Sequence, residues 1–483
     1  MPGWLGTADR ASPWPELDVV VAGIGVSGFA AADALIELGA RVTVIDERDG
    51  ESERERANIL EILGATVRLG AGSTASLPGE PGLVVTSPGW RPDAPILTEA
   101  AARDVPVWGE VELAWRCRPL DAPAPWLAVT GTNGKTTTVR MLAEMLSASG
   151  LRVAAAGNVG DPIISAVMNP EPYDVMAIEL SSFQLHWTRS MVARSAAVLN
   201  IAPDHLDWHG SYAAYAADKA RIYQGVEVAC VYNVADPATE QMVRDAEVTE
   251  GARAIGFTRA VPAVGMVGVV DGILVDRAFV TERQTSAAEL GNVTDVDPPA
   301  PHNIDNALAA AALARSFGVP AVAVRDGLHA FAPDPHRMTT VARDGGITWV
   351  DDSKATNTHA AAASLAAYDS VVWIGGGLAK GAEFDDLVES ARSRLRAVVL
   401  IGADRRLIAA ALARHAPEIP VVEVEQTDNE AMDKVVAAAA ELAQPGDTVL
   451  LAPACASMDM FANYGARGDA FAAAVGRRHG RRH

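Results

Sequence analysis

Short runs of β-branched and aliphatic residues alternate along the chain with longer Ala-rich segments. The apolar runs are typical of buried strands, and the Ala-rich segments are typical of helices. The strands expected from this pattern are Asp18–Ala22, Arg41–Ile45, Leu83–Thr86, Trp126–Thr130, Val175–Leu180, Ala196–Asn200, Val371–Ile374, Ala397–Ile401 and Thr448–Leu451. Because strands that alternate with helices form right-handed βαβ units, we expect an α/β fold with mainly parallel sheets.

Proline-rich breaks in this pattern divide the chain. Its 483 residues exceed one ordinary core, so two to four domains are expected. Arg118–Trp126 and Ala332–His336 are the expected boundaries. Asp295–Pro301 is also rich in proline, but it precedes a helical segment and is interpreted as a loop. The basic tail, Gly476–His483, is expected to be a solvated end.

The composition argues against several classes of partner. The formal net charge of −21 disfavours nucleic acid and anionic membrane surfaces, although a local basic pocket can still bind a small anion. Cys117, Cys230 and Cys455 show neither metal-ligand spacing nor a disulfide framework, which suits a reducing cytosol. We find no export signal and no apolar run of about 18 residues. A cytoplasmic protein without a membrane span is therefore expected.

A glycine-rich turn follows the first expected strand. Gly23-Ile24-Gly25-Val26-Ser27-Gly28 has G-x-G-x-x-G spacing, and the next strand ends at Asp46. Such glycines let backbone N–H groups approach a diphosphate at a helix N-terminus, and Asp46 is placed to accept from a ribose or base. A tight turn without any ligand gives the same spacing. The motif favours a nucleotide-shaped ligand without identifying it.

A second glycine turn, Gly131-Thr132-Asn133-Gly134-Lys135-Thr136-Thr137, follows the strand Trp126–Thr130. It resembles a phosphate-binding loop, although the strict G-x-x-x-x-G-K-[ST] spacing fails because Val129 stands where the first glycine would be. Consecutive N–H groups and the helix dipole still favour phosphate, Lys135 reaches the β and γ oxygens, and Thr136 can ligate Mg²⁺. The loop predicts a nucleoside triphosphate site.

Two further polar residues follow strands of the same block. Glu179 comes at the end of one strand, and His205 lies in Asp204-His205-Leu206-Asp207 just past the next. Both are candidate metal ligands, because Mg²⁺ needs more oxygen donors than Thr136 supplies and His binds metals or orients substrates. The structural alternatives are a helix N-terminal acid for Glu179 and a satisfied buried histidine for His205.

Lysine is scarce in this chain. Only five of the 40 Lys and Arg residues are lysine, namely Lys135, Lys219, Lys354, Lys380 and Lys434. The first four lie among glycines, hydroxyl residues or acids. Lysine differs from arginine in being a compact charge on phosphate and an amine that can lose its proton and react. The same bias also arises from genome composition, so the count alone assigns no role.

A series of motifs, taken in order, resembles the Mur ligases of peptidoglycan synthesis. The motifs are Thr130-Gly-Thr-Asn-Gly-Lys-Thr-Thr137, Gly157-Asn-Val-Gly160, Glu179-Leu-Ser-Ser-Phe-Gln184, Asp204-His-Leu-Asp207, Ala217-Asp-Lys-Ala-Arg221, His302-Asn303, Pro335-His-Arg337, Asp352-Ser-Lys-Ala-Thr-Asn357 and Pro453-Ala-Cys-Ala-Ser457. The resemblance extends from about residue 18 to 475. It implies an ATP-dependent ligase that adds D-glutamate to UDP-N-acetylmuramoyl-L-alanine through an acyl phosphate, and thereby serves cell-wall biogenesis, cell shape and cell division.

The resemblance also implies three domains. They are a Rossmann-like UDP-substrate-binding domain (1–113), a central P-loop ATPase-like domain with a mainly parallel sheet (114–333) and a Rossmann-like amino-acid-binding domain (334–483). The implied cofactors are ATP, two Mg²⁺ ions and a carbamate formed from CO2 on Lys219, which turns a cation into an anionic oxygen ligand. The implied partners are small molecules only, and a monomer is expected.

Residue roles implied by the resemblance fall into five groups. The catalytic residues are Lys135, Glu179, His205, Lys219 and Arg337. The ATP-binding residues are Gly131, Thr132, Asn133, Gly134, Lys135, Thr136, Thr137, Asn306, Arg337 and Asp352. The UDP-substrate-binding residues are Val26, Ser27, Glu47, Arg48, Gly89, Asn158, Ser182, Gln184 and His205. The D-glutamate-binding residues are Thr356, Lys380, Ser457 and Tyr464. The metal ligands are Thr136, Glu179, His205 and carbamylated Lys219.

The chain departs from the family pattern at three positions. Glu47 replaces a small hydroxyl residue, Pro301 precedes His302, and Tyr464 stands where relatives carry Phe. Other readings also stay open at this stage. They are another Mur ligase, a folylpolyglutamate synthetase-like ligase, a dehydrogenase using the first glycine loop, and a catalytically inactive binding or scaffold paralogue. Lys354 has no chemistry assigned beyond local positioning.

Overall fold

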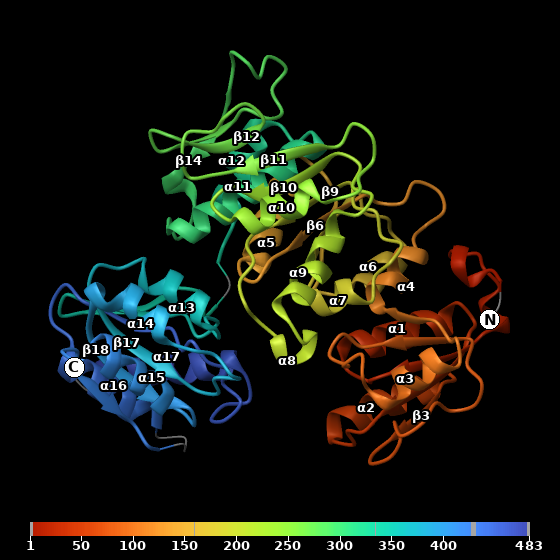
Figure 1. Cartoon of the computed structure of the whole chain (residues 1–483), viewed down its shortest axis with the longest axis horizontal. Helices are drawn as coiled ribbons and strands as arrows, with labels where there is room; N and C mark the ends of the chain where they lie inside the picture. Colours follow the sequence, from red (N-terminus) through yellow and green to blue (C-terminus); the bar gives the residue numbers. More distant parts are fainter. Residues whose placement is uncertain (1–2, 159, 334, 427–430, 481–483) are drawn as a thin grey trace. The chain divides into compact units, whose positions relative to one another are not determined.

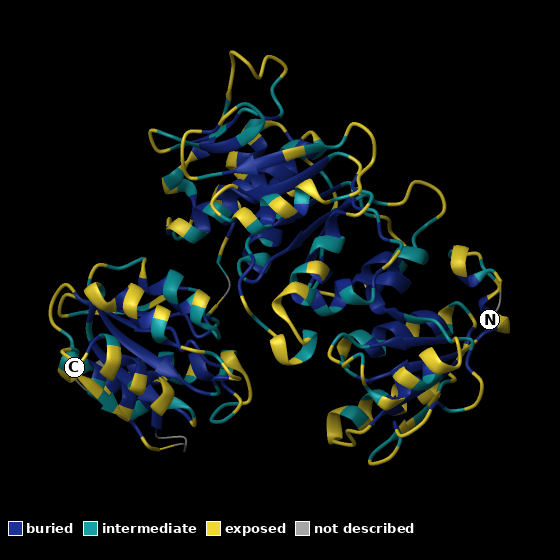
Figure 2. Ribbon diagram, viewed as in Figure 1, coloured by how far each residue is buried: buried dark blue, intermediate teal, exposed yellow. Residues whose placement is uncertain are grey.

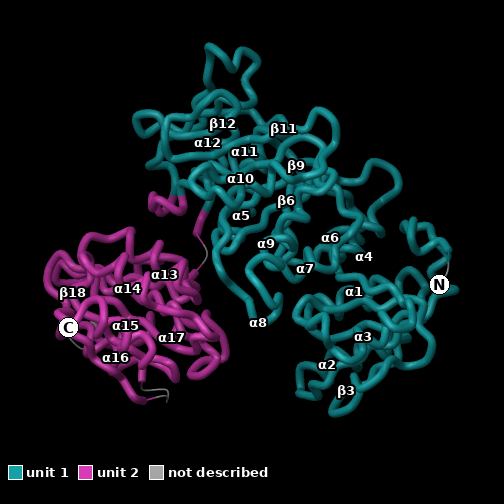
Figure 3. The backbone as a smooth tube through the Cα atoms, in the orientation of Figure 1, with its two compact units in different colours: residues 1–296, 304–331 teal, residues 297–303, 332–483 magenta. Residues whose placement is uncertain are grey.

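The computed structural model describes residues 3–158, 160–333, 335–426 and 431–480. Helices and strands alternate along much of the described chain (Figure 1), and each of the expected strands overlaps an observed one. The chain forms two compact units, residues 1–296 with 304–331 (unit 1) and residues 297–303 with 332–483 (unit 2) (Figure 3). The α/β prediction is therefore confirmed.

The first sheet of unit 1 is entirely parallel, in the order β3-β2-β1-β4-β5. Its strands are β1 (Asp18–Ala22), β2 (Arg41–Asp46), β3 (Thr66–Leu69), β4 (Leu83–Thr86) and β5 (Val107–Gly109). The helices between and after them are α1 (Val26–Glu37), α2 (Glu51–Ile62), α3 (Pro95–Ala102) and α4 (Glu110–Arg116). All four residues of β4 are buried, as expected for a central parallel strand covered on both faces.

The second sheet of unit 1 has the order β14-β13-β12-β11-β10-β9-β6-β8-β7. Its strands are β6 (Trp126–Thr130), β7 (Val153–Gly157), β8 (Val175–Glu179), β9 (Ser195–Val198), β10 (Ala229–Asn233), β11 (Arg253–Phe257), β12 (Met266–Val270), β13 (Ile273–Asp276) and β14 (Ala288–Asn292). The pairs β12–β13 and β13–β14 are antiparallel and the other pairs are parallel. The sheet is thus mainly parallel, as predicted.

Eight helices accompany this second sheet in the described chain. They are α5 (Lys135–Ala148), α6 (Ile163–Met168), α7 (Ser182–His186), α8 (Leu206–His209), α9 (Tyr212–Ala220), α10 (Pro237–Arg244), α11 (Pro301–Phe317) and α12 (Ala321–Ala330). Helix α12 packs so closely on α5 that a Cβ at Gly327 would lie 2.4 Å from Met145 Cα. The close packing of α12 against α5 holds α5 in position, and α5 begins at the second glycine loop.

Unit 2 contains a third sheet, in the order β15-β16-β20-β17-β18-β19. Its strands are β15 (Thr339–Asp344), β16 (Ile347–Asp351), β17 (Val371–Gly376), β18 (Leu395–Ile401), β19 (Val421–Glu423) and β20 (Thr448–Leu451), and only the edge pair β15–β16 is antiparallel. Its helices are α13 (Thr358–Leu365), α14 (Asp385–Ala391), α15 (Arg405–His415), α16 (Ala431–Leu442) and α17 (Tyr464–Gly480).

Within each unit the central strands are buried and the outer faces of the helices are exposed (Figure 2). The expected limit between residues 113 and 114 falls within α4, and the Pro-rich stretch after α4 leads into β6. Residue 334, where the third domain was expected to begin, lies outside the described residues, as do residues 481–483 of the basic tail. The limits of the three domains therefore stay predictions.

Candidate functional site

The first glycine loop joins β1 to α1 by a tight turn. Gly23 has φ 98°, and a Cβ at Gly28 would lie 1.9 Å from the Gly23 carbonyl oxygen. Only glycine fits at position 28, because the helix starts directly against the end of the strand. Val26 and Ser27, both predicted to contact the UDP group, form the first turn of α1, and the Val26 side chain is exposed.

Asp46, at the end of β2, holds this loop in place. One carboxylate oxygen accepts from the Ile24 N–H at 2.9 Å, and the carboxylate also accepts from the Arg48 guanidinium. Burial alone would raise the pKa of Asp46, but the hydrogen bonds from Arg48 and Ile24 lower it below its ordinary value. Glu47 accepts from the Thr74 hydroxyl at 2.7 Å. A Cβ on Gly89 would meet no atom within 4 Å, so the backbone there is open.

The second glycine loop joins β6 to α5 and is anchored to the segment after β9. The Asn133 N–H donates to Asn200 Oδ1 at 2.9 Å, and Asn200 Nδ2 donates back to the Asn133 carbonyl at 3.1 Å. The Thr132 hydroxyl lies 2.9 Å from the Tyr215 hydroxyl. Sequence reasoning missed Asn200 and Tyr215, because their contacts bridge 67 and 83 positions along the chain.

Asn306 on α11 packs directly on this loop. Gly134 has φ 85°, and a Cβ there would lie 2.2 Å from Asn306 Oδ1. The loop therefore needs glycine at 134 both for its backbone conformation and for its approach to Asn306. Thr136 and Thr137 are buried in the first turn of α5. The structure thus brings Asn306 to the predicted phosphate loop.

Two lysines converge on the Gly131 carbonyl. Lys135 Nζ donates to it at 3.0 Å and to the Thr132 carbonyl at 2.9 Å, while Lys219 Nζ donates to it at 2.8 Å. Lys219 is only 2% exposed. Burial lowers the pKa of the Lys219 ammonium well below its ordinary value, and the charge of Lys135 lowers it further, while Asp204 and Glu179 act in the opposite direction. The environment therefore favours a neutral, nucleophilic amine at Lys219.

Glu179 ends β8 as predicted and is 1% exposed. Its Oε1 accepts from Asn158 Nδ2 at 3.3 Å, while its Oε2 accepts no hydrogen bond from any described residue. A buried carboxylate oxygen without a donor carries a large desolvation cost, which a metal ion would offset. Gly157 permits this arrangement, since a Cβ there would lie 2.1 Å from the Glu179 carbonyl oxygen.

His205 is the N-cap residue of α8 and has a left-handed backbone, φ 52°. Its ring lies 4.7 Å from the Phe183 ring, and its Nε2 lies 3.5 Å from Asp204 Oδ2. Burial lowers the pKa of His205, and Lys135 and Lys219 lower it further, although Asp204 acts against this. A neutral imidazole is the form that binds metals. In the described chain no three His, Cys, Asp or Glu side chains group closely enough to hold an ion; the predicted set has only two such residues.

Ser182 and Gln184, both predicted to bind the UDP substrate, lie in the short helix α7. Gln184 Oε1 accepts from the Ser181 N–H and hydroxyl, both at 2.9 Å, and so closes a capping box. The Ser182 hydroxyl lies 2.9 Å from His209 Nε2. Both side chains form hydrogen bonds with other residues of the chain. Their contact with substrate stays a prediction.

Asp352 of unit 2 is buried and bound to its own surroundings. It accepts from the Met338 N–H at 3.2 Å and from the Ser364 hydroxyl. Burial raises its pKa to about 6, although Ser364 and Arg337 act in the opposite direction. The role of Asp352 at ATP stays a prediction.

The loops predicted to bind D-glutamate follow strands β16, β17 and β20. Leu378 and Ala456 exchange backbone hydrogen bonds of 3.0 and 2.9 Å, which bring the Lys380 loop beside the Ser457 loop. Lys380 has φ 50°. The ammonium of Lys354, in the Thr356 loop, lies 5.3 Å from the centre of the Tyr464 ring. The structure therefore gives Lys354 a position beside Tyr464, which the sequence alone did not.

Arg467 on α17 ties these loops together and was missed by sequence reasoning. It is 1% exposed, and its guanidinium donates to the Ser353 hydroxyl, the Ser353 carbonyl and the Cys455 carbonyl at 2.9, 2.9 and 3.1 Å. A planar guanidinium satisfies three such acceptors at once, which an ammonium cannot match. Sequence offers little signal here, because a buried arginine in a C-terminal helix resembles a surface residue.

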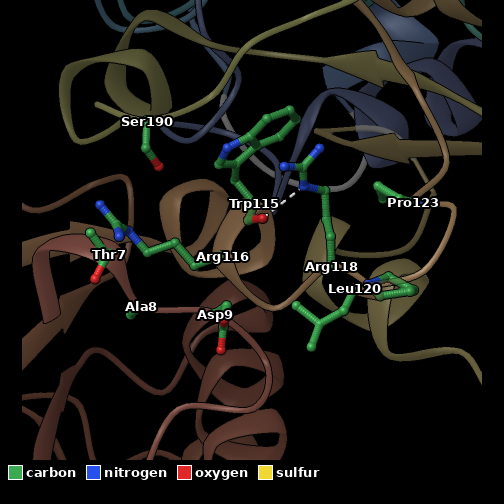
Figure 4. A pocket seen from close by; sticks show the side chains of 10 residues that line it. Thr7, Ala8, Asp9, Trp115, Arg116, Arg118, Leu120, Pro123 and Ser190 are labelled. Carbon is green, nitrogen blue, oxygen red and sulfur yellow. Dashed lines mark hydrogen bonds between the residues drawn. The ribbon is translucent and has the colours of Figure 1, made fainter. Parts of the chain in front are cut away.

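A cavity of about 290 Å³ lies elsewhere in unit 1, beside Asp9, Trp115, Arg116 and Arg118 (Figure 4). The described residues that line it include none of the predicted site residues. Arg116 is bound to Glu112 and to the Leu5 and Gly6 carbonyls, and Arg118 lies over the Trp115 ring. The predicted nucleotide site is therefore not this cavity.

Comparison with known proteins gives matches along most of the chain. Family models described as "Mur ligase MurD-like, N-terminal domain", "Mur ligase middle domain" and "Mur ligase, glutamate ligase domain" match residues 17–109, 129–314 and 336–455. The UDP-N-acetylmuramoylalanine--D-glutamate ligase of Streptomyces avermitilis is 65% identical over 96% of this chain and 98% of its own length. The ligase of the same name from Thermobifida fusca is 58% identical over 95% of this chain and 97% of its length.

Solved structures agree on the fold. UDP-N-acetylmuramate-alanine ligase from Thermotoga maritima matches with a TM-score of 0.56 at 19% identity, over 96% of this chain and 99% of that one. A pseudomurein peptide ligase type C from Methanothermus fervidus matches with a TM-score of 0.59 at 17% identity, over 95% and 99%. Together with the close relatives, the three matched domains show that this chain belongs to the Mur ligase family.

Proposed function

We propose that this chain joins D-glutamate to UDP-N-acetylmuramoyl-L-alanine in an ATP-driven reaction of peptidoglycan precursor synthesis. The observation that carries the proposal is the 65% identity over 96% of the chain to a relative that bears the name of this activity. The geometry of the second glycine loop, with Lys135 and Lys219 on one carbonyl, supports the chemistry. The dehydrogenase and scaffold readings explain neither lysine.

The chemistry must activate a carboxylate, because a free carboxylate does not react with an amine at neutral pH. We infer that an oxygen of the alanyl carboxylate attacks the γ-phosphorus of ATP, which forms an acyl phosphate and releases ADP. The amine of D-glutamate then attacks the acyl carbon, loses a proton, and expels phosphate. Lys135 and Arg337 stabilise the negative charge that gathers as two anions meet, each by roughly 2–4 kcal/mol.

Magnesium would be held by Thr136, Glu179, His205 and carbamylated Lys219. The unpartnered Glu179 Oε2 and the threonine hydroxyl are oxygen donors of the kind that Mg²⁺ prefers. When bound, Mg²⁺ supplies charge that screens the repulsion between ATP and the anionic acceptor. The two-ion count is part of the proposal and follows from the family resemblance.

The carbamate on Lys219, which the family resemblance implies, is supported by the same environment. The neutral amine attacks the carbon of CO2, an N–C bond forms, and one N–H proton leaves to water, which gives an anionic oxygen ligand. A depressed ammonium pKa favours the first step, and burial is its main cause. Arginine at 219 cannot undergo this reaction.

The remaining assignments belong to the same proposal. The UDP substrate is assigned to Val26, Ser27, Glu47, Arg48, Gly89, Asn158, Ser182, Gln184 and His205, and D-glutamate to Thr356, Lys380, Ser457 and Tyr464. We place the reaction in the cytoplasm, with the chain acting as a monomer. The structure adds one observation on membranes, that no helix among the described residues is long and apolar enough to span one.

Phosphate release tests the proposal. The full chain is supplied with ATP, Mg²⁺ and UDP-N-acetylmuramoyl-L-alanine, together with D-glutamate, L-glutamate, L-alanine or a diamino acid. We expect release that requires both the UDP-sugar acceptor and D-glutamate. Release that is indifferent to either compound, or that prefers another amino acid, would contradict the proposal. A folate acceptor that replaces the UDP-sugar would indicate a folylpolyglutamate synthetase-like ligase instead.

A further inference from the structure

His209, a buried histidine that is not among the predicted site residues, links the helices α7, α8 and α9. His209 ends α8, and its side chain has 0% exposure. Its Nδ1 lies 3.0 Å from Asp218 Oδ2 on α9, and its Nε2 lies 2.9 Å from the Ser182 hydroxyl on α7. Its ring also stacks on Phe183 at 5.4 Å with an interplanar angle of 5°. Nothing in the proposed reaction assigns His209 a role.

The hydrogen-bond directions follow from Asp218. Its Oδ2 accepts from both His186 Nδ1 and His209 Nδ1, since an ionised carboxylate has no proton to donate. A neutral His209 with its proton on Nδ1 has a lone pair on Nε2 and must accept there from the Ser182 hydroxyl. The Ser182 proton is thereby directed at His209 Nε2, and only oxygen lone pairs of Ser182 remain for a ligand.

The arrangement resembles the Ser–His–Asp order of acyl hydrolases, but Ser182 is only 2% exposed. A nucleophile must be reached by its substrate, so the burial of Ser182 argues for a supporting role. The elements that His209 joins carry or adjoin two of the predicted metal ligands, His205 and Lys219. Asp218 precedes Lys219 on α9, and Phe183 contacts the His205 ring at 4.7 Å.

We propose that His209, held by Asp218, is a positioning residue that fixes Ser182 and Phe183 and so sets the placement of His205 for phosphoryl transfer. The inference rests on the proposed ligase reaction. Its consequence is that losing the His209 link slows the chemical step and leaves D-glutamate binding, which is assigned to unit 2, unchanged.

The test compares His209→Asn, Ser182→Ala and their double variant. Asparagine at 209 keeps a donor near the Nδ1 position but cannot reach Ser182. We expect each single variant to lower kcat by roughly 10- to 100-fold, the effect of a small displacement of a reacting group. The KM for D-glutamate should stay within about twofold. Because both changes break one link, the double variant should be no slower than the slower single variant.

His186→Gln is the matched control. His186 shares Asp218 Oδ2, but its side chain forms no hydrogen bond with the Ser182 hydroxyl in the described part of the chain and is 25% exposed. We expect its kcat within about twofold of the wild type. Ser182→Ala carries the test even if His209→Asn does not fold, because it removes only a hydroxyl.

A wild-type kcat in Ser182→Ala, or effects of Ser182→Ala and His209→Asn that multiply in the double variant, would overturn the inference. Covalent labelling of Ser182 by a fluorophosphonate would do the same, since it would show a reachable nucleophile. These failures are distinct from failure of the proposed function, which appears as the absence of D-glutamate-dependent phosphate release in the wild-type chain itself.

Discussion

Glu110 and Glu112, two buried glutamates at the start of α4, should contribute to the free energy of unfolding with opposite dependences on pH. Glu110 Oε1 accepts from the Ile164 N–H at the start of α6, and Glu112 accepts from the Arg189 and Ser190 N–H groups, the Ser190 hydroxyl and Arg116. Burial raises the pKa of Glu110 to about 7, although the Ile164 and Ile163 N–H groups act against it. Burial would also raise the pKa of Glu112, but its four donors lower it below the ordinary value.

The sign of each effect follows from proton linkage. Folded Glu110 holds its proton more tightly than the unfolded chain, so its contribution to stability is complete below pH 4.5 and is lost as the pH rises through about 7. A rise in pKa from 4.5 to about 7 corresponds to about 3 kcal/mol, at about 1.4 kcal/mol per pH unit. Glu110→Gln cannot ionise, and we expect it to escape this loss.

Urea unfolding of the wild type and of Glu110→Gln between about pH 5 and pH 8 measures the effect. Relative to the wild type, Glu110→Gln should gain stability as the pH rises, by up to about 3 kcal/mol across the window. The matched variant Glu112→Gln should be destabilised at neutral pH, and its deficit should shrink only as the pH falls below 4.5. A difference between Glu110→Gln and the wild type that does not change with pH would refute the reasoning.

Substitutions at the phosphate loop and in unit 2 separate chemistry from stability. Lys135→Ala should cut turnover by a factor on the order of 10² or more with an unchanged circular dichroism spectrum; near-normal turnover would remove Lys135 from the ATP site. Lys219→Ala should be inactive and partly restored by a short-chain carboxylic acid, while full activity without rescue would exclude the carbamate. Arg467→Met should destabilise unit 2 by about 3 kcal/mol, because three buried acceptors lose their donor; an unchanged urea midpoint would contradict this.

Several central strands could be predicted from sequence because both of their faces are buried, although β10, which is also buried at every residue, was not expected. β6 and β8 are buried at every residue, and in each strand all residues but the last are apolar. Strands near the sheet edges gave no such signal. β15, in which no residue is fully buried, and the antiparallel strands β13 and β14, which are only partly buried, were not expected. These strands form because they pair with neighbouring strands, and the pattern of apolar residues within each one does not indicate that pairing.

The candidate site divides in a similar way. The positions of the second glycine loop and Glu179 were predictable, since the local sequence places them at the ends of strands. The residues that support them were not, because their contacts join distant segments. Asn200 meets the loop across 67 positions, and Arg467 meets Ser353 across 114. Ser182 was predicted as a substrate contact, but the sequence could not show that its hydroxyl lies against His209.

Oxygen transfer tests the central claim most directly. UDP-N-acetylmuramoyl-L-alanine labelled with ¹⁸O in both carboxylate oxygens is incubated with the chain, ATP, Mg²⁺ and D-glutamate, and the released phosphate is analysed by mass spectrometry. If the carboxylate is activated as an acyl phosphate, each phosphate released carries one ¹⁸O and the new amide keeps the other. Unlabelled phosphate formed in step with the amide product would contradict the account.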